Sequence, residues 1–378
     1  MSTALVLSGG GARGAYQAGV LLGLKELGVV GAQKQPFDIL IGTSAGSLNC
    51  TMWAAYSDNP DEGLREMQLV WSRLRASQVF RTDVWSVISN AVGWVRDLSL
   101  GGLVGRVSPR ALLDTAPLKR LLTSLPWARL RWNLEQRRYQ ALGILATNYT
   151  TSNGVLFLQD RTDIPPWTRV RYRVERGWIG KEHLMASSAI PVIFPAIPLG
   201  GCFYGDGSLR NTAPLGPAIQ LGARKIVAVG VREGAEMGVP IGGGIQPPKL
   251  ADVAGVLLDA VLLDAIEVDV QHCLRLNKLA MQGDSFRPID VLWLRPSQRL
   301  ASLALQLEKR IPPAVRYLLR GLGDDEATAE LASYLIFDGE YCRSLMEFGR
   351  QDVLNRADEV LRFFASGDVG AEGAQVVV

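Results

Sequence analysis

The stretch FDILIGTSAGSLNCTMWAAY (Phe37–Tyr56) decides the fold that we expect for this chain. It begins as an apolar run of strand length, and from Leu48 onward it can form a helix. The motif GTSAG at residues 42–46 joins the two parts, and its glycines allow the backbone to turn sharply. A G-x-S-x-G motif between a strand and a helix is typical of a nucleophile elbow. Ser44 is therefore our candidate nucleophile, and the alternative is a glycine-rich turn that only packs a helix on a strand.

A second strand, loop and helix precede this stretch. The apolar run Ala4–Leu7 is followed by the loop SGGGARG at residues 8–14 and by apolar positions at helical spacing over Ala15–Leu27. The loop contains G-x-G-x-x-G, so a Rossmann dinucleotide site is one interpretation. That site needs an acidic residue about 20 positions further on, at the end of the second strand. Here the second strand ends in GTSAG instead.

The glycine loop can also bind another anion. Consecutive glycines at the start of a helix present unobstructed backbone N–H groups and the positive end of the helix dipole. The loop from Gly9 to Gly14 is therefore a candidate oxyanion hole, with the N–H groups of Gly10 and Gly11 as donors and Arg13 as a nearby positive charge. The alternatives are a phosphate site for a nucleotide and a purely structural turn.

The glycine loop and the elbow follow consecutive strands that one helix separates. In a parallel β-α-β unit both loops lie at the carboxyl ends of their strands. Ser44 and the amides of the glycine loop are then expected to face the same crevice.

Composition and charge indicate an ordinary globular protein. The chain has 378 residues, 48% hydrophobic and 20% charged, enough for one large domain or two smaller ones. A formal net charge of +3 is too small to indicate nucleic-acid binding, which usually requires a concentrated basic face. The four cysteines are scattered without a C-x-x-C pair, so we expect free thiols rather than disulfides or a metal site.

No segment predicts export or membrane insertion. The N-terminus has no basic region before its short apolar run, and no uninterrupted apolar span reaches the roughly 20 residues of a transmembrane helix. We therefore expect a cytoplasmic protein that is either free in solution or peripheral at a membrane surface.

Tryptophan and basic residues are concentrated in residues 71–138. This region contains five tryptophans and twelve Lys or Arg residues against four acidic residues. Such a combination is typical of a surface that contacts anionic lipid headgroups. The alternative is a helical insertion whose tryptophans belong to the core and whose arginines face solvent.

Apolar and turn patterns predict the remaining elements, which are a hairpin of Gln140–Thr147 and Gly154–Gln159, a short helix within Lys181–Pro191, strands at Lys225–Val231 and Asp290–Leu294, a long helix at Leu250–Met281, and helices from 297 to 364.

The loop YGDGS, residues 204–208, follows the short helix. An aspartate between two glycines is by default a turn former. Asp206 becomes a candidate site residue only because Ser44 needs a base.

The base must come from a histidine or an acid, because a serine hydroxyl attacks poorly unless its proton is accepted. His183 and His272 both fall in predicted helices rather than after strands, so we expect both to be structural. Asp206 is then the best-placed acceptor. Its pKa in water is about 3.9, and desolvation beside Ser44 would raise that pKa and make it a stronger base.

Four motifs of the chain occur in a characteristic order. They are GGGARG at 9–14, GTSAG at 42–46, ASSAIP at 186–191 with Phe194 and Pro195, and Asp206-Gly207. In order and spacing they resemble the patatin-like phospholipases, and the resemblance extends from about residue 4 to 216. The segment YLIFDGEYCRSLMEFG at 334–349 also resembles the end of bacterial members of that family.

This resemblance implies an α/β fold, a three-layer α/β/α sandwich with a mostly parallel central sheet. It also implies a Ser44–Asp206 dyad, the glycine loop as oxyanion hole, and no metal or cofactor. Where the family has Asp-Gly-Gly or Asp-Gly-Ala, this chain has Asp206-Gly207-Ser208, and the small serine should still allow the loop to form. We expect a catalytic domain at 1–296, with the insertion 71–138, and a helical extension at 297–378.

We therefore expect a serine lipid acyl hydrolase that cleaves acyl esters of phospholipids or lysophospholipids. Ser44 would attack the carbonyl, Asp206 would accept the proton, and water would hydrolyse the acyl-enzyme. One alternative is an acyltransferase or thioesterase with the same dyad. Others are a nucleotide-binding protein that uses the glycine loop and a non-catalytic membrane-surface protein. The sequence predicts neither head group, chain length nor oligomeric state.

Overall fold

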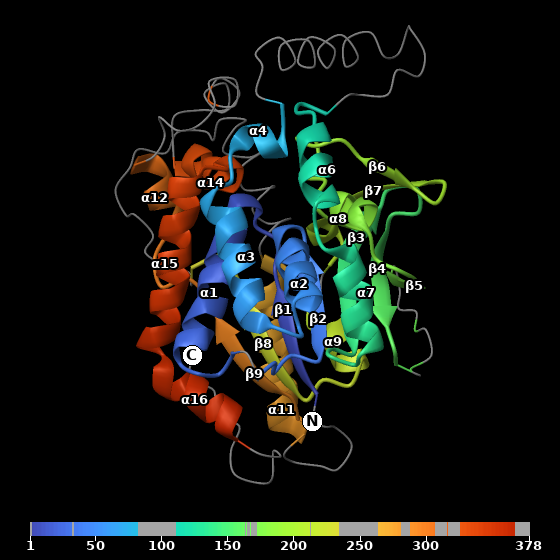
Figure 1. Cartoon of the computed structure of the whole chain (residues 1–378). Helices are drawn as coiled ribbons and strands as arrows, with labels where there is room; N and C mark the ends of the chain where they lie inside the picture. The colour runs from blue at the N-terminus through green and yellow to red at the C-terminus, as the bar shows by residue number, and fades with distance from the viewer. Residues whose placement is uncertain are drawn as a thin grey trace, which may run out of the picture.

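One mixed, mostly parallel sheet forms the centre of the protein (Figure 1). The computed structural model describes residues 2–31, 34–81, 111–162, 164, 167, 172–211, 213–233, 264–280, 288–306, 316 and 326–366. The strands are β1 (Thr3–Leu7), β2 (Ile39–Thr43), β3 (Ala141–Asn148), β4 (Asn153–Asp160), β5 (Tyr172–Arg176), β6 (Ile197–Leu199), β7 (Cys202–Asp206), β8 (Lys225–Val229) and β9 (Asp290–Leu294). Within the described ranges their order is β5-β4-β3-β2-β1-β8-β9, with β7 paired to β3 and β6 paired to β7.

The pairing of the strands brings the predicted loops to one edge of the sheet. β1 is parallel to β2 and β8, and the register aligns Leu7 with Gly42. The glycine loop and the elbow therefore leave the sheet side by side. β3 and β4 form the predicted antiparallel hairpin. β7 runs antiparallel to β3 and aligns Asp206 with Ala146, so the Asp-Gly loop reaches the same edge.

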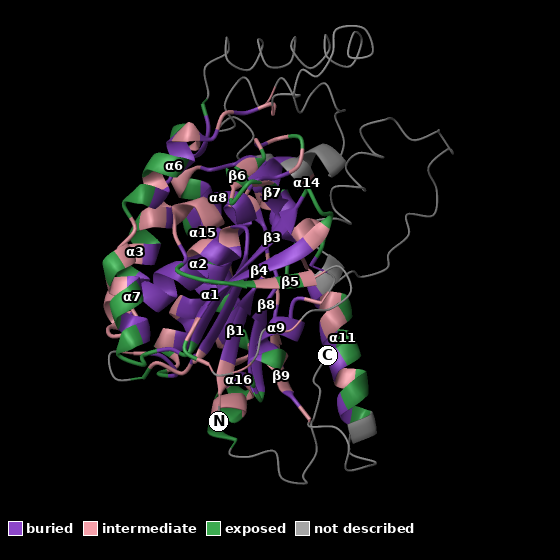
Figure 2. Ribbon diagram, turned by 90° about the vertical axis from the view of Figure 1, so that its right-hand side faces the viewer, coloured by how far each residue is buried: buried purple, intermediate pink, exposed green. Residues whose placement is uncertain are grey.

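Helices cover both faces of the sheet. They are α1 (Gly14–Glu26), α2 (Ala45–Ala55), α3 (Pro60–Ser72), α4 (Ala76–Val79), α6 (Ala116–Thr123), α7 (Trp127–Glu135), α8 (Lys181–Ser187), α9 (Gly216–Gln220), α11 (Asp264–Ala280), α12 (Leu300–Gln306), α14 (Glu326–Leu335), α15 (Gly339–Asn355) and α16 (Ala357–Ala365), with short 3-10 turns η1 (Gly11–Arg13) and η2 (Gly207–Leu209). Figure 2 shows that buried residues are concentrated in the sheet and on the helix faces that meet it.

The core divides into two layers because successive strand residues point to opposite faces. Leu5 and Leu7 of β1 face the cluster that contains residues of α1, α2 and α15. Ala4 and Val6 face a second cluster with residues of α9 and α11. This arrangement confirms the predicted α/β fold with a mostly parallel sheet between layers of helices.

The C-terminal helices belong to the first of these layers. α15 packs along α1, and the α-carbon of Gly19 lies so close to the backbone of Met346 that a Cβ there would overlap its carbonyl oxygen. Gly349 approaches the carbonyl of Tyr16 in the same way. The proposed boundary between residues 296 and 297 stays a prediction, but α15 shares its hydrophobic cluster with the sheet.

The Trp-rich region, residues 71–138, contains both buried and exposed tryptophans. Trp71 belongs to α3 and is buried, and its indole N–H donates to Oδ1 of Asn49 at 2.9 Å. Trp71 therefore belongs to the core, as the alternative interpretation of the region expects, and lipid contact by the rest of the region stays a prediction. Trp132 is 45% exposed. Trp85 and Trp94 lie outside the described residues, as does the first part, 250–263, of the predicted long helix.

Several boundaries also differ from the predicted ones. The helix after the elbow begins at Ala45 rather than Leu48, and β8 ends at Val229. All four cysteines are free, as predicted. Among the helices that the structure describes, none combines the length and apolarity required to cross a membrane.

We predict that Gly19→Ala destabilises the protein by about 1–3 kcal/mol, because the new methyl group must push α15 away from α1. Chemical denaturation measures the loss. Gly177→Ala is the matched control, since Gly177 is exposed and no atom lies within 4 Å of the position that its Cβ would take. Equal unfolding free energies for the two variants would contradict the close packing of these helices.

Candidate active site

Ser44 stands at the junction of β2 and α2 in a strained conformation. Its φ of 52° and ψ of −123° lie in a region that residues with a side chain rarely adopt. The glycines around it permit this turn through close backbone contacts. A Cβ at Gly42 would lie 2.6 Å from the α-carbon of Ser47, and one at Gly46 would lie 2.6 Å from the carbonyl oxygen of Ser8. The sequence GTSAG therefore forms a tight turn from β2 into α2.

A buried hydroxyl holds the backbone of the elbow. The N–H of Ser44 donates to Oγ of Ser187 at 2.9 Å, and that Oγ donates to the carbonyl of Leu145 at 2.6 Å. Ser187 is fully buried at the end of α8, and Leu145 belongs to β3. Through one hydroxyl, α8 and β3 together fix the position of Ser44.

Asp206 is held by its backbone at the end of β7. Its N–H donates to the carbonyl of Ala189 at 2.9 Å, and its own carbonyl accepts from Oγ1 of Thr147 at 2.8 Å. The carboxylate is fully buried, and its Oδ1 accepts from the N–H of Ser208 at 2.9 Å. Its Oδ2 has no hydrogen-bond partner among the described residues. One carboxylate oxygen is thus fixed and the other is unsatisfied.

The environment makes this carboxylate a stronger base. Burial raises the pKa of Asp206 to about 6, and the N–H of Ser208 and the hydroxyl of Ser44 oppose part of that rise. The Ser44 hydroxyl is thus near enough to favour the ionised carboxylate, yet no hydrogen bond of ordinary geometry joins it to Oδ2. Catalytic hydrogen bonds are often loose before substrate binds. A rotation of the Ser44 side chain would supply the donor that Oδ2 lacks.

The glycine loop lies against Ser44 and against Ser208, which follows Asp206 by two positions. A Cβ at Gly9 would lie 3.3 Å from Cβ of Ser44 and 2.7 Å from Oγ of Ser208. Gly10 and Gly11 open the turn η1, and Gly11 lines the pocket described below. Three loops that are far apart in the sequence therefore meet at one point.

Two other predicted site residues have different neighbours. The side chain of Arg13 is fully buried, and its Nη2 donates to Oε1 of Glu330 at 2.6 Å. Its charge is therefore paired with α14. Gly14 begins α1, and a Cβ there would lie 2.7 Å from Cβ of Ala45 on α2. Gly14 thus allows the two helices to start close together.

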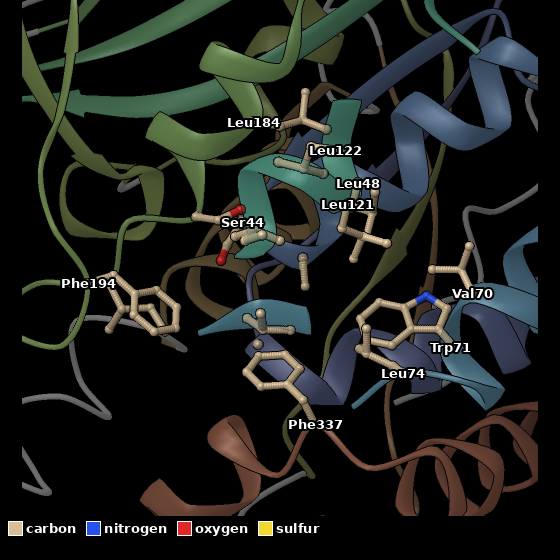
Figure 3. A pocket seen from close by; sticks show the side chains of 16 residues that line it. Ser44, Leu48, Val70, Trp71, Leu74, Leu121, Leu122, Leu184, Phe194 and Phe337 are labelled. Atoms are coloured by element: carbon tan, nitrogen blue, oxygen red, sulfur yellow. The ribbon is translucent and has the colours of Figure 1, made fainter. Parts of the chain in front are cut away.

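An apolar pocket opens at Ser44. The empty space in the pocket and in the open solvent at its mouth together amounts to about 580 Å³, and Figure 3 shows Ser44 among the side chains that line the pocket. Those residues are Gly11, Ser44, Ala45, Leu48, Val70, Trp71, Leu74, Val79, Leu118, Leu121, Leu122, Leu184, Ser188, Ile190, Phe194 and Phe337. None of these lining residues carries a charge. The pocket can therefore hold a hydrocarbon chain beside the hydroxyl.

The histidines lie in structural environments. Nδ1 of His183 accepts from the N–H of Gly180 at 3.0 Å, and its ring packs edge-on against Phe157. Burial lowers the pKa of His183. His272 is exposed on α11. Within the described ranges, no group of three His, Cys, Asp or Glu side chains is placed to hold a metal ion.

Comparison with known proteins identifies the family. The family model for patatin-like phospholipases matches residues 5–219, more than half of the chain. The chain belongs to the patatin-like phospholipase family. This is a family of hydrolases that act on carboxylic esters of lipids. This family assignment confirms the resemblance seen in the sequence.

Structural comparison of this patatin-like protein finds a distant similarity to VipD from Legionella pneumophila. The two chains have 15% sequence identity and a TM-score of 0.30, over 74% of this chain and 55% of the VipD chain. The chain thus spans about half the length of VipD. Comparison with the curated proteins finds no match.

The sequence alone did not reveal the roles of two residues in this patatin-like site. Ser187 occurs in the ASSAIP motif that supported the resemblance, but no role followed from its position. Phe337 lines the pocket from a segment well outside the family model. The motif itself was the available signal for Ser187. For Phe337 the signal was its place in the segment 334–349, but that resemblance did not indicate a position at the pocket.

We predict that Ser187→Ala slows fluorophosphonate labelling of Ser44 about 10-fold or more, because a misplaced nucleophile loses reactivity steeply. The change also leaves the Ser44 N–H buried without an acceptor. Intact-mass kinetics measure the labelling rate. Ser57→Ala is the control, since Ser57 is also buried and its hydroxyl donates to the carbonyl of Trp53, away from the elbow. Wild-type labelling by the Ser187 variant would show that this bridge does not position the elbow.

Proposed function

We propose that the protein is a serine lipid acyl hydrolase of the phospholipase A or lysophospholipase type, acting through Ser44 and Asp206. One observation carries the proposal. The strained serine opens into an uncharged apolar pocket while a buried carboxylate with an unsatisfied oxygen lies beside it. The family assignment supports the class of reaction.

The proposed reaction begins with attack of the Ser44 hydroxyl on the acyl carbonyl. Asp206 accepts the hydroxyl proton on its free Oδ2, and a tetrahedral intermediate forms. The N–H groups of Gly10 and Gly11 hold the oxyanion. The intermediate collapses to an acyl-enzyme as the alcohol leaves with the proton. Water activated by Asp206 then attacks the acyl-enzyme and releases the fatty acid, which regenerates the Ser44 hydroxyl.

The pocket supports an acyl chain as the group beside Ser44. Its lining is aliphatic and aromatic, so a hydrocarbon chain can replace water there at a gain of about 25 cal/mol for each Å² of apolar surface removed from water. A nucleotide would place phosphates in a space where none of the lining residues offers a charge. These features favour the lipid interpretation of the glycine loop over the nucleotide one.

We predict that Ser44→Ala and Asp206→Asn each lower turnover of a fluorogenic acyl ester at least about 100-fold while the proteins stay folded. In the wild type, kcat/KM should rise as pH increases through about 6 and then level off. The sign follows because Asp206 accepts a proton only when it is ionised, and burial raises its pKa to about 6.

Two results would refute this dyad. One is wild-type turnover by either variant, and the other is a kcat/KM that falls as pH rises from 5 to 7, a range that brackets the raised pKa. Product analysis with an added alcohol or lysolipid separates hydrolysis from acyl transfer. Circular dichroism verifies that each variant is folded.

We predict that Leu121→Trp discriminates against long acyl chains. Leu121 is a partly buried residue of the pocket wall, and a larger ring there would fill space meant for the chain. The ratio of kcat/KM for palmitoyl over butyryl esters should fall about 10-fold. Lys119→Trp, on the exposed side of the same helix, is the control. An unchanged ratio in the Leu121 variant would place the acyl chain elsewhere.

A further inference from the structure

The glycine loop is held by a helix that lies outside the matched family region. The family model ends at residue 219, whereas α14 spans Glu326–Leu335 and packs against η1. Arg13 makes the connection. Its Nε donates to Oγ of Ser333 at 2.8 Å, and its Nη2 donates to Oε1 of Glu330 at 2.6 Å. Its Nη1 donates to the hydroxyl of Tyr334 at 3.3 Å and to the carbonyl of Val231 at 3.4 Å.

The same helix also contacts the loop at Gly11. This residue has a φ of +54°, and a Cβ on it would overlap the carbonyl oxygen of Tyr334. On the neighbouring residue, a Cβ at Gly10 would lie 2.7 Å from Cγ2 of Val231. The two proposed oxyanion donors are therefore confined between the end of α14 and Val231, two residues after β8.

A buried guanidinium requires compensation, because removal of one partner of a buried ion pair leaves an uncompensated charge. Arg13 is fully buried, and Glu330 is the acid that pairs with it in the structure. Burial alone would lower the pKa of Arg13, but Tyr334 and Glu330 raise it above its ordinary value. Arg13 stays charged and stays bound to α14.

We infer that Glu330 is a positioning residue that fixes Arg13 and, through Arg13, the Gly10 and Gly11 amides. The inference rests on the proposed function, since it concerns the oxyanion hole of that reaction. It assigns α14 to the catalytic unit. In this inference Arg13 positions the glycine loop and does not contact the oxyanion directly.

A positioning role has a specific kinetic signature. Oxyanion donors must lie within about 0.5 Å of their productive position, and they act mainly in the transition state. The acyl chain binds in the pocket, which does not include Glu330. Loss of Glu330 should therefore lower kcat and leave KM nearly unchanged, whereas a purely structural role would lower stability alone.

The test compares Glu330→Ala, Glu330→Gln and the matched control Glu359→Ala. Glu359 pairs with Arg356 at 2.6 Å, and the Glu359 side chain is 24% exposed. Glu330 pairs with Arg13 at the same distance of 2.6 Å, and the Glu330 side chain is 19% exposed. We expect Glu330→Ala to lower kcat about 10–100-fold with KM changed less than about 2-fold. Glu330→Gln keeps an acceptor for Nη2 and should recover most of the rate. Glu359→Ala should keep wild-type kcat.

A transition-state analogue provides the second readout. The inhibition constant of a trifluoromethyl ketone, which forms an oxyanion on Ser44, should rise in Glu330→Ala in proportion to the loss of kcat/KM. If Glu330→Ala does not fold, Ser333→Ala removes the partner of Arg13 Nε and is measured in the same way.

Wild-type kcat and inhibition constants in the folded variants would overturn the inference. The same holds if Glu359→Ala loses as much kcat as Glu330→Ala. Ser44→Ala separates the two proposals. Full activity in Ser44→Ala refutes the proposed function itself, whereas an inactive Ser44→Ala beside a fully active Glu330→Ala refutes only the role of Glu330.

Discussion

The site depends on a carboxylate that the fold buries and then leaves half satisfied. Burial of a charge is costly unless hydrogen bonds compensate for it. For Asp206 the compensation is incomplete. Its Oδ1 accepts a hydrogen bond from the N–H of Ser208, whereas its Oδ2 has no hydrogen-bond donor among the described residues. Hydrogen bonds to Ala189 and Thr147 fix the backbone of Asp206, and the N–H of Ser208 holds its carboxylate through Oδ1. The hydroxyls of Ser44 and Ser208 both lie close enough to this carboxylate to lower its pKa.

The sheet places the Ser44 hydroxyl. Parallel pairing of β1 with β2, in a register that aligns Leu7 with Gly42, brings two loops to one edge. Antiparallel pairing of β7 with β3 brings the third loop to the same edge. Side chains would separate these loops, so glycine occupies the positions where backbone meets backbone. The strain at Ser44 is of the order of 1–3 kcal/mol, and the surrounding contacts must sustain it.

Much of this arrangement could be predicted because its signals are local. The elbow, the glycine loop and the hairpin each occupy a short segment with its own pattern, and parallel connection rules bring the loops together. The contacts that could not be predicted join distant segments. Arg13 and Glu330 are 317 positions apart, and nothing in the loop sequence specifies that partner. Trp71 looked like an interfacial residue because composition cannot distinguish a buried ring from an exposed one.

The close approach of α1 and α15 has a consequence for biosynthesis. The elbow and the glycine loop are made within the first 46 residues, but the helix that covers α1 is encoded at 339–355. Until that helix has been translated, the nascent polypeptide exposes an apolar stripe containing the small residues around Gly19. The close packing of α1 against α15 can therefore form only after this late helix has been made.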